Sequence, residues 1–270
     1  MADWLRDGMI AYARRLEARS AGIPRVLNRK IGAIAAAWLI VFGFAGLLRL
    51  LFPASPFAGM GDFLGTALPY LLIALAPIAG YRIAAGSFPN GVLTAQPGIR
   101  LSIYGKWRQL SLLDARRNPA FGPTGFMASL LIGLLLNVVL RSFEFLVAVP
   151  AITSQAPEWS QAMFHLMAAD VIVMSFFYMV CFVMALRSVP LFPRMLLFVW
   201  ALDIAAQLII AVNLGSMTDL PLSVAVPLQD LLYGNIQKVF ISMLVWLPYL
   251  ILSDRVNITY RQRVRAELQH

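Results

Sequence analysis

The sequence predicts an all-α, polytopic membrane protein: a bundle of about six transmembrane helices. Two observations predict this class. Hydrophobic residues make up 60% of the 270 residues and charged residues only 13%, whereas soluble domains carry roughly 25% charged residues. The apolar residues also gather in long runs, with the cations between them. Part of every soluble fold must face water, and a bilayer removes the need to hide so much apolar surface.

Each apolar run is long enough for a membrane-spanning helix, which needs about 20 mostly apolar residues. Pro53 and Pro150 end the first and third runs. Pro69 and Pro77 lie inside the second run, where a membrane helix tolerates them better than a soluble one. The six predicted spans cover residues 31–52, 63–81, 126–149, 162–186, 195–214 and 230–252.

The distribution of cations predicts the orientation. All but three of the 22 Lys and Arg residues lie before the first span, between spans two and three, beside the turn between spans four and five, or after the last span. The opposite loops, residues 53–62, 150–161 and 215–229, contain neither Lys nor Arg. Cytoplasmic loops carry the excess of Lys and Arg, so we expect both termini in the cytoplasm. Short loops and an Ala-, Leu- and Arg-rich composition indicate a bacterial inner membrane.

The chain divides into five expected segments. Residues 2–19 place apolar side chains on one helical stripe, which predicts an amphipathic helix in the membrane interface or on the protein's own cytoplasmic face. Residues 82–122 contain turn signals and partial alternation, which fit a short hairpin or an amphipathic helix. The segments are the cytoplasmic N-terminal segment 1–30, spans 31–81, the cytoplasmic connection 82–122, spans 123–253 and the basic cytoplasmic tail 254–270.

Ionisable residues inside the spans are candidates for function, because each costs free energy in hydrocarbon. The three cations outside the basic regions and three of the carboxylates fall in the outer half of the spans, a balance that mutual pairing would produce. We interpret them as a polar cluster or cavity open toward the periplasm; the alternative is that they pair or reach the interface and only fix helix packing. The cluster comprises Arg49, Arg141, Glu144, Asp170, Asp230 and Lys238.

Asp203 lies near the middle of the fifth span, with Trp200 and Gln207 on its face. Intramembrane carboxylates mark proton relays, and this residue is the candidate mid-membrane carboxylate. The alternatives are simple protonation or a hydrogen bond to Gln207.

The basic regions predict contacts with anionic lipid headgroups. Membrane lipids are therefore expected partners, other membrane protein subunits are possible ones, and nucleic acid is not expected because no recognition motif accompanies the charge. The expected headgroup contacts are Arg14, Arg15, Arg255, Arg261 and Arg263.

Catalytic motifs are missing from the sequence. It contains no P-loop, HExxH, GxSxG or nucleotide-binding fingerprint, and His165 lacks the i, i+4 spacing to Asp170 that a shared metal would need. We assign no catalytic, cofactor-binding or metal-binding residue, leave the cofactor unknown, and lean against an enzyme.

Two stretches of the C-terminal half carry a family resemblance. Residues 186–193 read Leu-Arg-Ser-Val-Pro-Leu-Phe-Pro, and residues 253–260, after Trp246 and Pro248-Tyr249, read Ser-Asp-Arg-Val-Asn-Ile-Thr-Tyr. From about residue 126 onward the chain resembles a family of small, usually four-span bacterial inner-membrane proteins described as a domain of unknown function. The resemblance implies no activity.

Three functions follow as hypotheses. The favoured one is a non-catalytic accessory or assembly subunit that packs against other membrane proteins, because catalytic motifs are missing from the sequence and the loops are short. The second is a transporter or channel for a small solute or proton, based on Asp203 and the outer charges. The third is a lipid-binding or lipid-processing protein that uses the cationic cytoplasmic surface.

Overall fold

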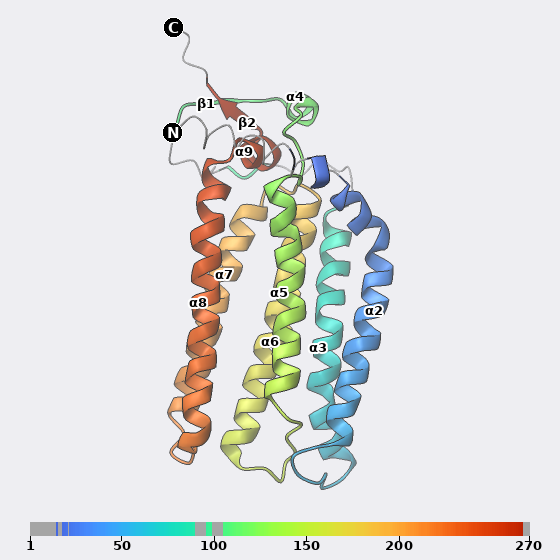
Figure 1. Cartoon of the computed structure of the whole chain (residues 1–270), viewed down its shortest axis with the longest axis vertical. Helices are drawn as coiled ribbons and strands as arrows, with labels where there is room; N and C mark the ends of the chain where they lie inside the picture. The colour runs from blue at the N-terminus through green and yellow to red at the C-terminus, as the bar shows by residue number, and fades with distance from the viewer. Residues whose placement is uncertain (1–14, 16–17, 21, 90–95, 99–104, 267–270) are drawn as a thin grey trace.

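The chain forms an all-α bundle of membrane-length helices, shown in Figure 1 as a computed structural model. The structure describes residues 15, 18–20, 22–89, 96–98 and 105–266. Six of its helices are long and apolar enough to cross a membrane, which makes the chain a multi-pass membrane protein and confirms the predicted number of spans. They are α2 (Ile23–Leu51), α3 (Met60–Ser87), α5 (Phe126–Ala148), α6 (Glu158–Leu186), α7 (Phe192–Gly215) and α8 (Leu222–Leu252). The predicted amphipathic helix of residues 2–19 falls largely outside the described residues.

Several helices are longer than the apolar runs that predicted them. The sixth begins at Leu222 instead of residue 230, and the fourth at Glu158 instead of residue 162. Prolines 221 and 157 stand immediately before these helices. A hydropathy pattern reports the stretch that suits hydrocarbon, whereas the backbone continues its hydrogen bonding beyond that stretch until a proline or turn ends it.

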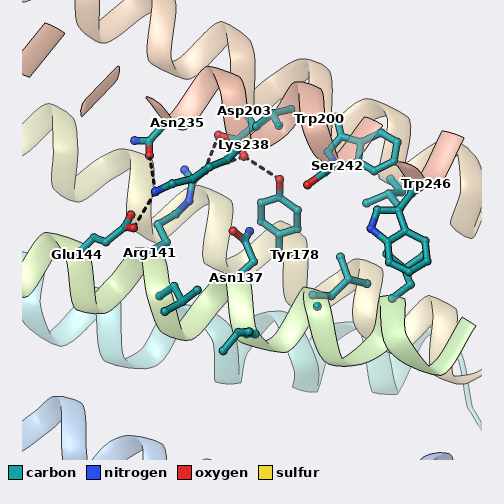
Figure 2. A pocket seen from close by; sticks show the side chains of 17 residues that line it. Asn137, Arg141, Glu144, Tyr178, Trp200, Asp203, Asn235, Lys238, Ser242 and Trp246 are labelled. Atoms are coloured by element: carbon teal, nitrogen blue, oxygen red, sulfur yellow. Dashed lines mark hydrogen bonds and ion pairs between the residues drawn. The ribbon is translucent and has the colours of Figure 1, made fainter. Parts of the chain in front are cut away.

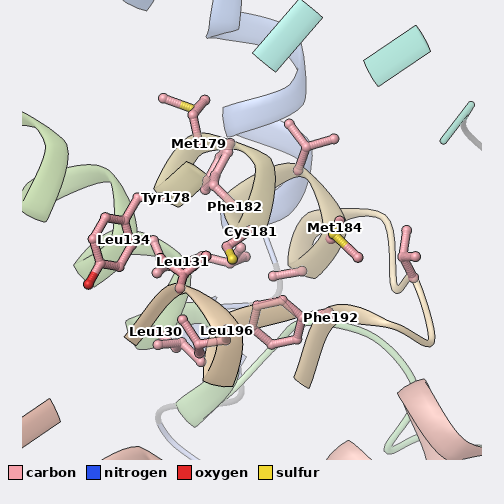
Figure 3. Packing of buried hydrophobic residues seen from close by; sticks show 14 of the residues in the cluster. Leu130, Leu131, Leu134, Tyr178, Met179, Cys181, Phe182, Met184, Phe192 and Leu196 are labelled. Atoms are coloured by element: carbon pink, nitrogen blue, oxygen red, sulfur yellow. The ribbon is translucent and has the colours of Figure 1, made fainter. Parts of the chain in front are cut away.

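Helix α6 occupies the centre of the bundle and packs on α3, α5 and α7. Half of its most apolar stretch is buried, against 11% for the peripheral helices α2 and α8. Figure 3 shows the main hydrophobic cluster, in which side chains of α5, α6 and α7 interdigitate. Its labelled members include Leu131, Cys181, Phe182, Phe192 and Leu196.

One glycine sets the distance between α3 and α6. A Cβ atom at Gly80 would lie 2.5 Å from the backbone oxygen of Phe176, well inside van der Waals contact. Because that obstacle is backbone, a side chain at position 80 would push the two helices apart. Small residues permit such close approach between membrane helices.

The end of the bundle that carries the start of α2 and the end of α8 is covered by short elements, which we call the cap. The cap consists of α4 (Leu112–Arg117), β1 (Trp107–Gln109), α9 (Asp254–Arg261) and β2 (Arg263–Arg265). Strands β1 and β2 pair antiparallel, with Trp107 opposite Arg265 and Gln109 opposite Arg263. The strand in the 82–122 connection therefore pairs with the C-terminal tail. This corrects the expectation of a local hairpin or a membrane-lying helix for the residues around Trp107.

The tail is built into the cap. The Tyr260 hydroxyl donates to the Ala185 carbonyl oxygen at 2.8 Å, which ties α9 to the end of α6. The Asn257 side-chain oxygen accepts from Arg261 at 3.1 Å and from Arg263 at 2.8 Å. The two arginines are only 5% and 4% exposed, and the Arg263 guanidinium lies 4.7 Å from the ring centre of Trp107. They are interior groups of the cap, a correction to their expected role as surface contacts for lipid headgroups.

Candidate functional site

The middle of the bundle contains a buried guanidinium between two carboxylates from different helices. Arg141 of α5 lies 2.8 Å from Asp170 of α6. Its other terminal nitrogen lies 2.6 and 2.7 Å from the two carboxylate oxygens of Asp203 on α7. The Asp203 side chain is 1% exposed, and those of Asp170 and Arg141 are 9% and 12% exposed. Charge-assisted hydrogen bonds of this length are strong, and they join three helices.

Neutral polar groups extend this ion cluster. The Tyr178 hydroxyl of α6 donates to Asp203 at 2.7 Å. The Gln207 amide of α7 donates to Asp170 at 3.1 Å, and the Asn235 amide of α8 donates to the Gln207 side-chain oxygen at 3.2 Å. Asp203 therefore accepts hydrogen bonds from Arg141 and Tyr178, and not from Gln207 on its own helix.

An ion pair between α5 and α8 completes the array. The Lys238 ammonium lies 2.7 Å from Glu144 and 3.4 Å from the Asn235 side-chain oxygen. The Lys238 side chain is 60% exposed and the Glu144 side chain is 43% exposed. A continuous polar network thus runs from the buried Tyr178–Asp203 end to the exposed Lys238–Glu144 end. We call it the polar network, made of Arg141, Glu144, Asp170, Tyr178, Asp203, Gln207, Asn235 and Lys238.

Helical spacing explains how each helix contributes to the polar network. Residues three or four apart share a helix face, which holds for Arg141 with Glu144, Asp203 with Gln207, and Asn235 with Lys238. The side chains can therefore meet only because these three faces point toward one another and toward Asp170 and Tyr178 of α6.

A cavity of about 280 Å³ lies beside the polar network, between α5, α7 and α8. Figure 2 shows Glu144, Arg141 and Lys238 at one end of this α5–α8 cavity and Trp246 at the other. Asp203 and Tyr178 line its inner wall, so the charged groups face open space as well as one another. The remaining lining residues are Leu130, Gly133, Leu134, Leu136, Asn137, Leu140, Leu196, Trp200, Asn235, Val239 and Ser242.

Helices α5 and α8 touch at the two ends of this cavity. Toward the cap, the Phe126 ring lies 4.7 Å from Trp246 and 4.9 Å from Tyr249, measured between ring centres. Away from the cap, Glu144 pairs with Lys238. The cavity occupies the interval between these two contacts, because α8 packs mainly on α7.

The site can hold charge and exchange protons through hydrogen bonds. The described residues contain no group of three or more His, Cys, Asp or Glu side chains that could hold a metal ion. A second, smaller space of about 30 Å³ lies against Asp170, Gln207 and Asn235. That is more than the roughly 10–15 Å³ that one water molecule needs by the same measure.

Two residues of the expected cluster lie elsewhere. The Arg49 guanidinium donates to the Leu146 and Val147 carbonyl oxygens at 2.6 and 2.9 Å. The last carbonyls of a helix lack partners within it, so Arg49 satisfies the end of α5. Asp230 is exposed on α8 and makes no hydrogen bond or ion pair with any residue that the structure describes. The expected six-residue cluster is therefore corrected to Arg141, Glu144, Asp170 and Lys238, joined by Asp203.

The other expected headgroup contacts differ in their placement. Arg14 is outside the described residues, and Arg15 is exposed. Arg255 is half-buried, and its guanidinium donates to the Thr124 hydroxyl before α5. This hydrogen bond ties α9 to the connection that leads into α5.

The sequence analysis did not identify Tyr178 or Asn235 as members of a polar site. A tyrosine in an apolar run has the same pattern as a core aromatic residue, and no local signal separates the two. Asn235 and Lys238 did interrupt the apolar run of α8, which was the one available signal for that part of the polar network.

Comparison of the chain with family models, curated proteins and solved structures gives no match.

Proposed function

We propose that the protein is a transporter or channel for a small solute or proton, and that the α5–α8 cavity with Asp203 is its site. One observation carries the proposal: the polar network lines a cavity and runs from a side chain that is 1% exposed to one that is 60% exposed. Polar groups that only fixed helix packing would not need open space beside them. Intramembrane ionisable groups that face a cavity typically mark a path for ions or substrates.

The charge balance of the polar network indicates what the cavity accepts. Three carboxylates, Asp170, Asp203 and Glu144, face two cations, Arg141 and Lys238. With all five ionised, one negative charge is left over. A net charge held in a buried site is costly, and one proton or one monovalent cation would remove that cost. We infer that the transported or coupling species is a proton or a small cation.

The cavity lining supports a small solute. Ligand sites are mostly apolar, with a few polar groups that fix orientation. The α5–α8 cavity has this composition: Trp200 and Trp246 supply aromatic surface, and Asn137 and Ser242 supply neutral hydrogen-bonding groups. Aromatic faces next to a carboxylate also suit a cationic group.

Proton movement is tested in proteoliposomes that enclose a pH-sensitive dye. An inside-negative membrane potential, imposed by an outward potassium gradient and valinomycin, drives protons into the lumen. We expect wild-type protein to acidify the lumen faster than protein-free liposomes, and Asp203→Asn to reduce the rate to the protein-free value. Asp219→Asn is the matched control, because Asp219 is an exposed carboxylate in the loop before α8. Wild-type rates in Asp203→Asn would contradict the proposal for protons. Uptake of sodium or of tetramethylammonium into liposomes of the same composition, under the same membrane potential, tests whether a small cation is transported instead.

A second candidate, the assembly subunit, is favoured by a separate feature of α8. Asp230, Tyr233 and Gln237 recur at helical spacing on its exposed side. Neither Asp230 nor Gln237 has a hydrogen-bonding partner in the described chain. Polar side chains on a lipid-facing helix surface are satisfied by another helix. Site-specific photocrosslinking at residue 233, in the native membrane, would capture a neighbouring protein if this candidate holds and lipid alone if it does not.

We further propose a bacterial inner-membrane location, with the cap in the cytoplasm. The described loops at the end opposite the cap contain no Lys or Arg, and the positive-inside rule supports the orientation. Attachment of a cysteine-reactive, membrane-impermeant label to Ser216→Cys, an exposed position at the end of α7, tests it in intact cells. Labelling supports the orientation and exclusion contradicts it.

A further inference from the structure

The cap contains a small cavity surrounded by hydrogen-bond donors. The cavity measures about 10 Å³ and lies where α9 meets the turn before α7. That is about the least space that can hold one water-sized group. Its lining consists of Gln96, Pro97, Pro190, Pro193, Arg194, Tyr260 and Arg261.

Two of the donors at this cavity are buried and have no acceptor among the described residues. The Nη2 atom of Arg194 and the Nε2 atom of Gln96 are both shielded from solvent and make no hydrogen bond with any residue that the structure describes. Leaving a buried donor unsatisfied costs about 1–3 kcal/mol, and more for a charged group. Two such donors at one cavity indicate a missing acceptor.

The missing acceptor must also balance positive charge. The hydrogen bonds of Arg261 go to neutral oxygens, those of Leu250 and Asn257. In the part of the chain that the structure describes, neither Arg194 nor Arg261 contacts a carboxylate. Burial, then the nearby guanidiniums of Arg263 and Arg194, lower the pKa of Arg261 to about 10. The local field therefore disfavours the positive charges that the sequence places here.

We propose that this cavity binds one oxygen of a phosphate-type anion, held by Arg194, Arg261 and Gln96. Guanidinium groups bind phosphate through charge-assisted hydrogen bonds, and the amide of Gln96 adds a neutral donor. The cavity lies at the same end of the bundle as the basic residues of the cap. The anion is free phosphate or the phosphate of a lipid headgroup, since both present the same oxygen. This site is distinct from the α5–α8 cavity.

The test measures thermal unfolding of the full-length protein in dodecyl maltoside, a detergent without phosphate, at constant ionic strength. One arm titrates inorganic phosphate. The other adds phosphatidylglycerol, with diacylglycerol of the same chains as the phosphate-free control. A ligand that binds only the folded state raises the unfolding midpoint in a saturable way. We expect the unfolding midpoint to rise in at least one arm. A rise with phosphatidylglycerol alone assigns the site to a lipid headgroup. A rise with inorganic phosphate assigns it to the free anion.

Variants show whether the rise comes from this cavity. Arg194→Gln should weaken the apparent affinity by about tenfold or more, the loss expected for one hydrogen bond to a charged group. Arg117→Gln, at an exposed cation of α4, removes the same charge and should leave the affinity unchanged. Gln96→Ala, which keeps both guanidiniums, should weaken it by a smaller factor and serves as the test if Arg194→Gln does not fold. No saturable rise in either arm, or equal affinity in wild type and both cavity variants, would overturn the proposal.

Discussion

One terminal nitrogen of Arg141 lies within 2.7 Å of both carboxylate oxygens of Asp203, although 62 residues separate them in the chain. The contact joins α5 to α7 across the centre of the bundle, and Asp170 of α6 shares the same guanidinium. This contact balances charge that hydrocarbon would otherwise penalise, and it forms one wall of the α5–α8 cavity.

Arg141→Ala should destabilise the protein by about 3–5 kcal/mol, because it leaves two buried carboxylates without a counter-ion. Unfolding by SDS in mixed micelles measures the change. Arg117→Ala, at an exposed cation of the cap, should change stability by less than about 0.5 kcal/mol. The double variant Arg141→Ala/Asp203→Ala should cost less than the sum of the two single changes, since it removes both members of the pair. Additive costs would show that the pair does not interact.

Gly80→Ala should destabilise by about 1–3 kcal/mol, the usual cost of overpacking a core, because its Cβ atom would meet the Phe176 carbonyl oxygen. Gly65→Ala is a matched control in the same helix, since nothing lies within 4 Å of a Cβ atom there. The control should be neutral or up to about 1 kcal/mol more stable. Equal stability of the two variants would show that α3 and α6 are not held at this distance.

Lys238→Ala should cost less than about 1 kcal/mol, because exposed ion pairs contribute little to stability. It should nevertheless open the α5–α8 cavity by removing the ion pair that joins these helices at the end away from the cap. The readout is the rate at which a small maleimide modifies Ser242→Cys, whose side chain lines the cavity. We expect a faster rate with Lys238→Ala than without it. Cys181 is fully buried, so protein lacking the new cysteine should stay unmodified and supplies the background.

Asn257→Ala should destabilise the cap by roughly 3 kcal/mol, since each hydrogen bond to a charged group contributes about 1.5–3 kcal/mol and Asn257 accepts from both Arg261 and Arg263. Limited proteolysis should cut the tail after α8 faster in this variant. Asn213→Ala removes an exposed hydrogen bond to the Ile209 carbonyl oxygen and should leave the cleavage rate unchanged. If both variants resist proteolysis equally, Asn257 does not hold the cap together.

The sequence by itself determined the number of spans and their approximate places. Length and hydropathy suffice for this, because a helix that satisfies its own backbone is the solution for a single apolar segment in hydrocarbon. It also identified the costly charges, since an ionisable residue inside an apolar run is visible without any partner. Arg141, Glu144, Asp170, Asp203 and Lys238 were all found in this way.

Only the tertiary structure decided how those residues combine. Asp203 pairs with Arg141 instead of Gln207, Arg49 satisfies the end of α5, and Trp107 joins a strand from the far end of the chain. Tyr178 belongs to the polar network although its local pattern is that of a core residue. Pairing depends on how each helix is rotated and which helices are neighbours, and these are set by packing details such as Gly80 against Phe176. Hydropathy contains one value per residue, and therefore carries no information about which faces will meet.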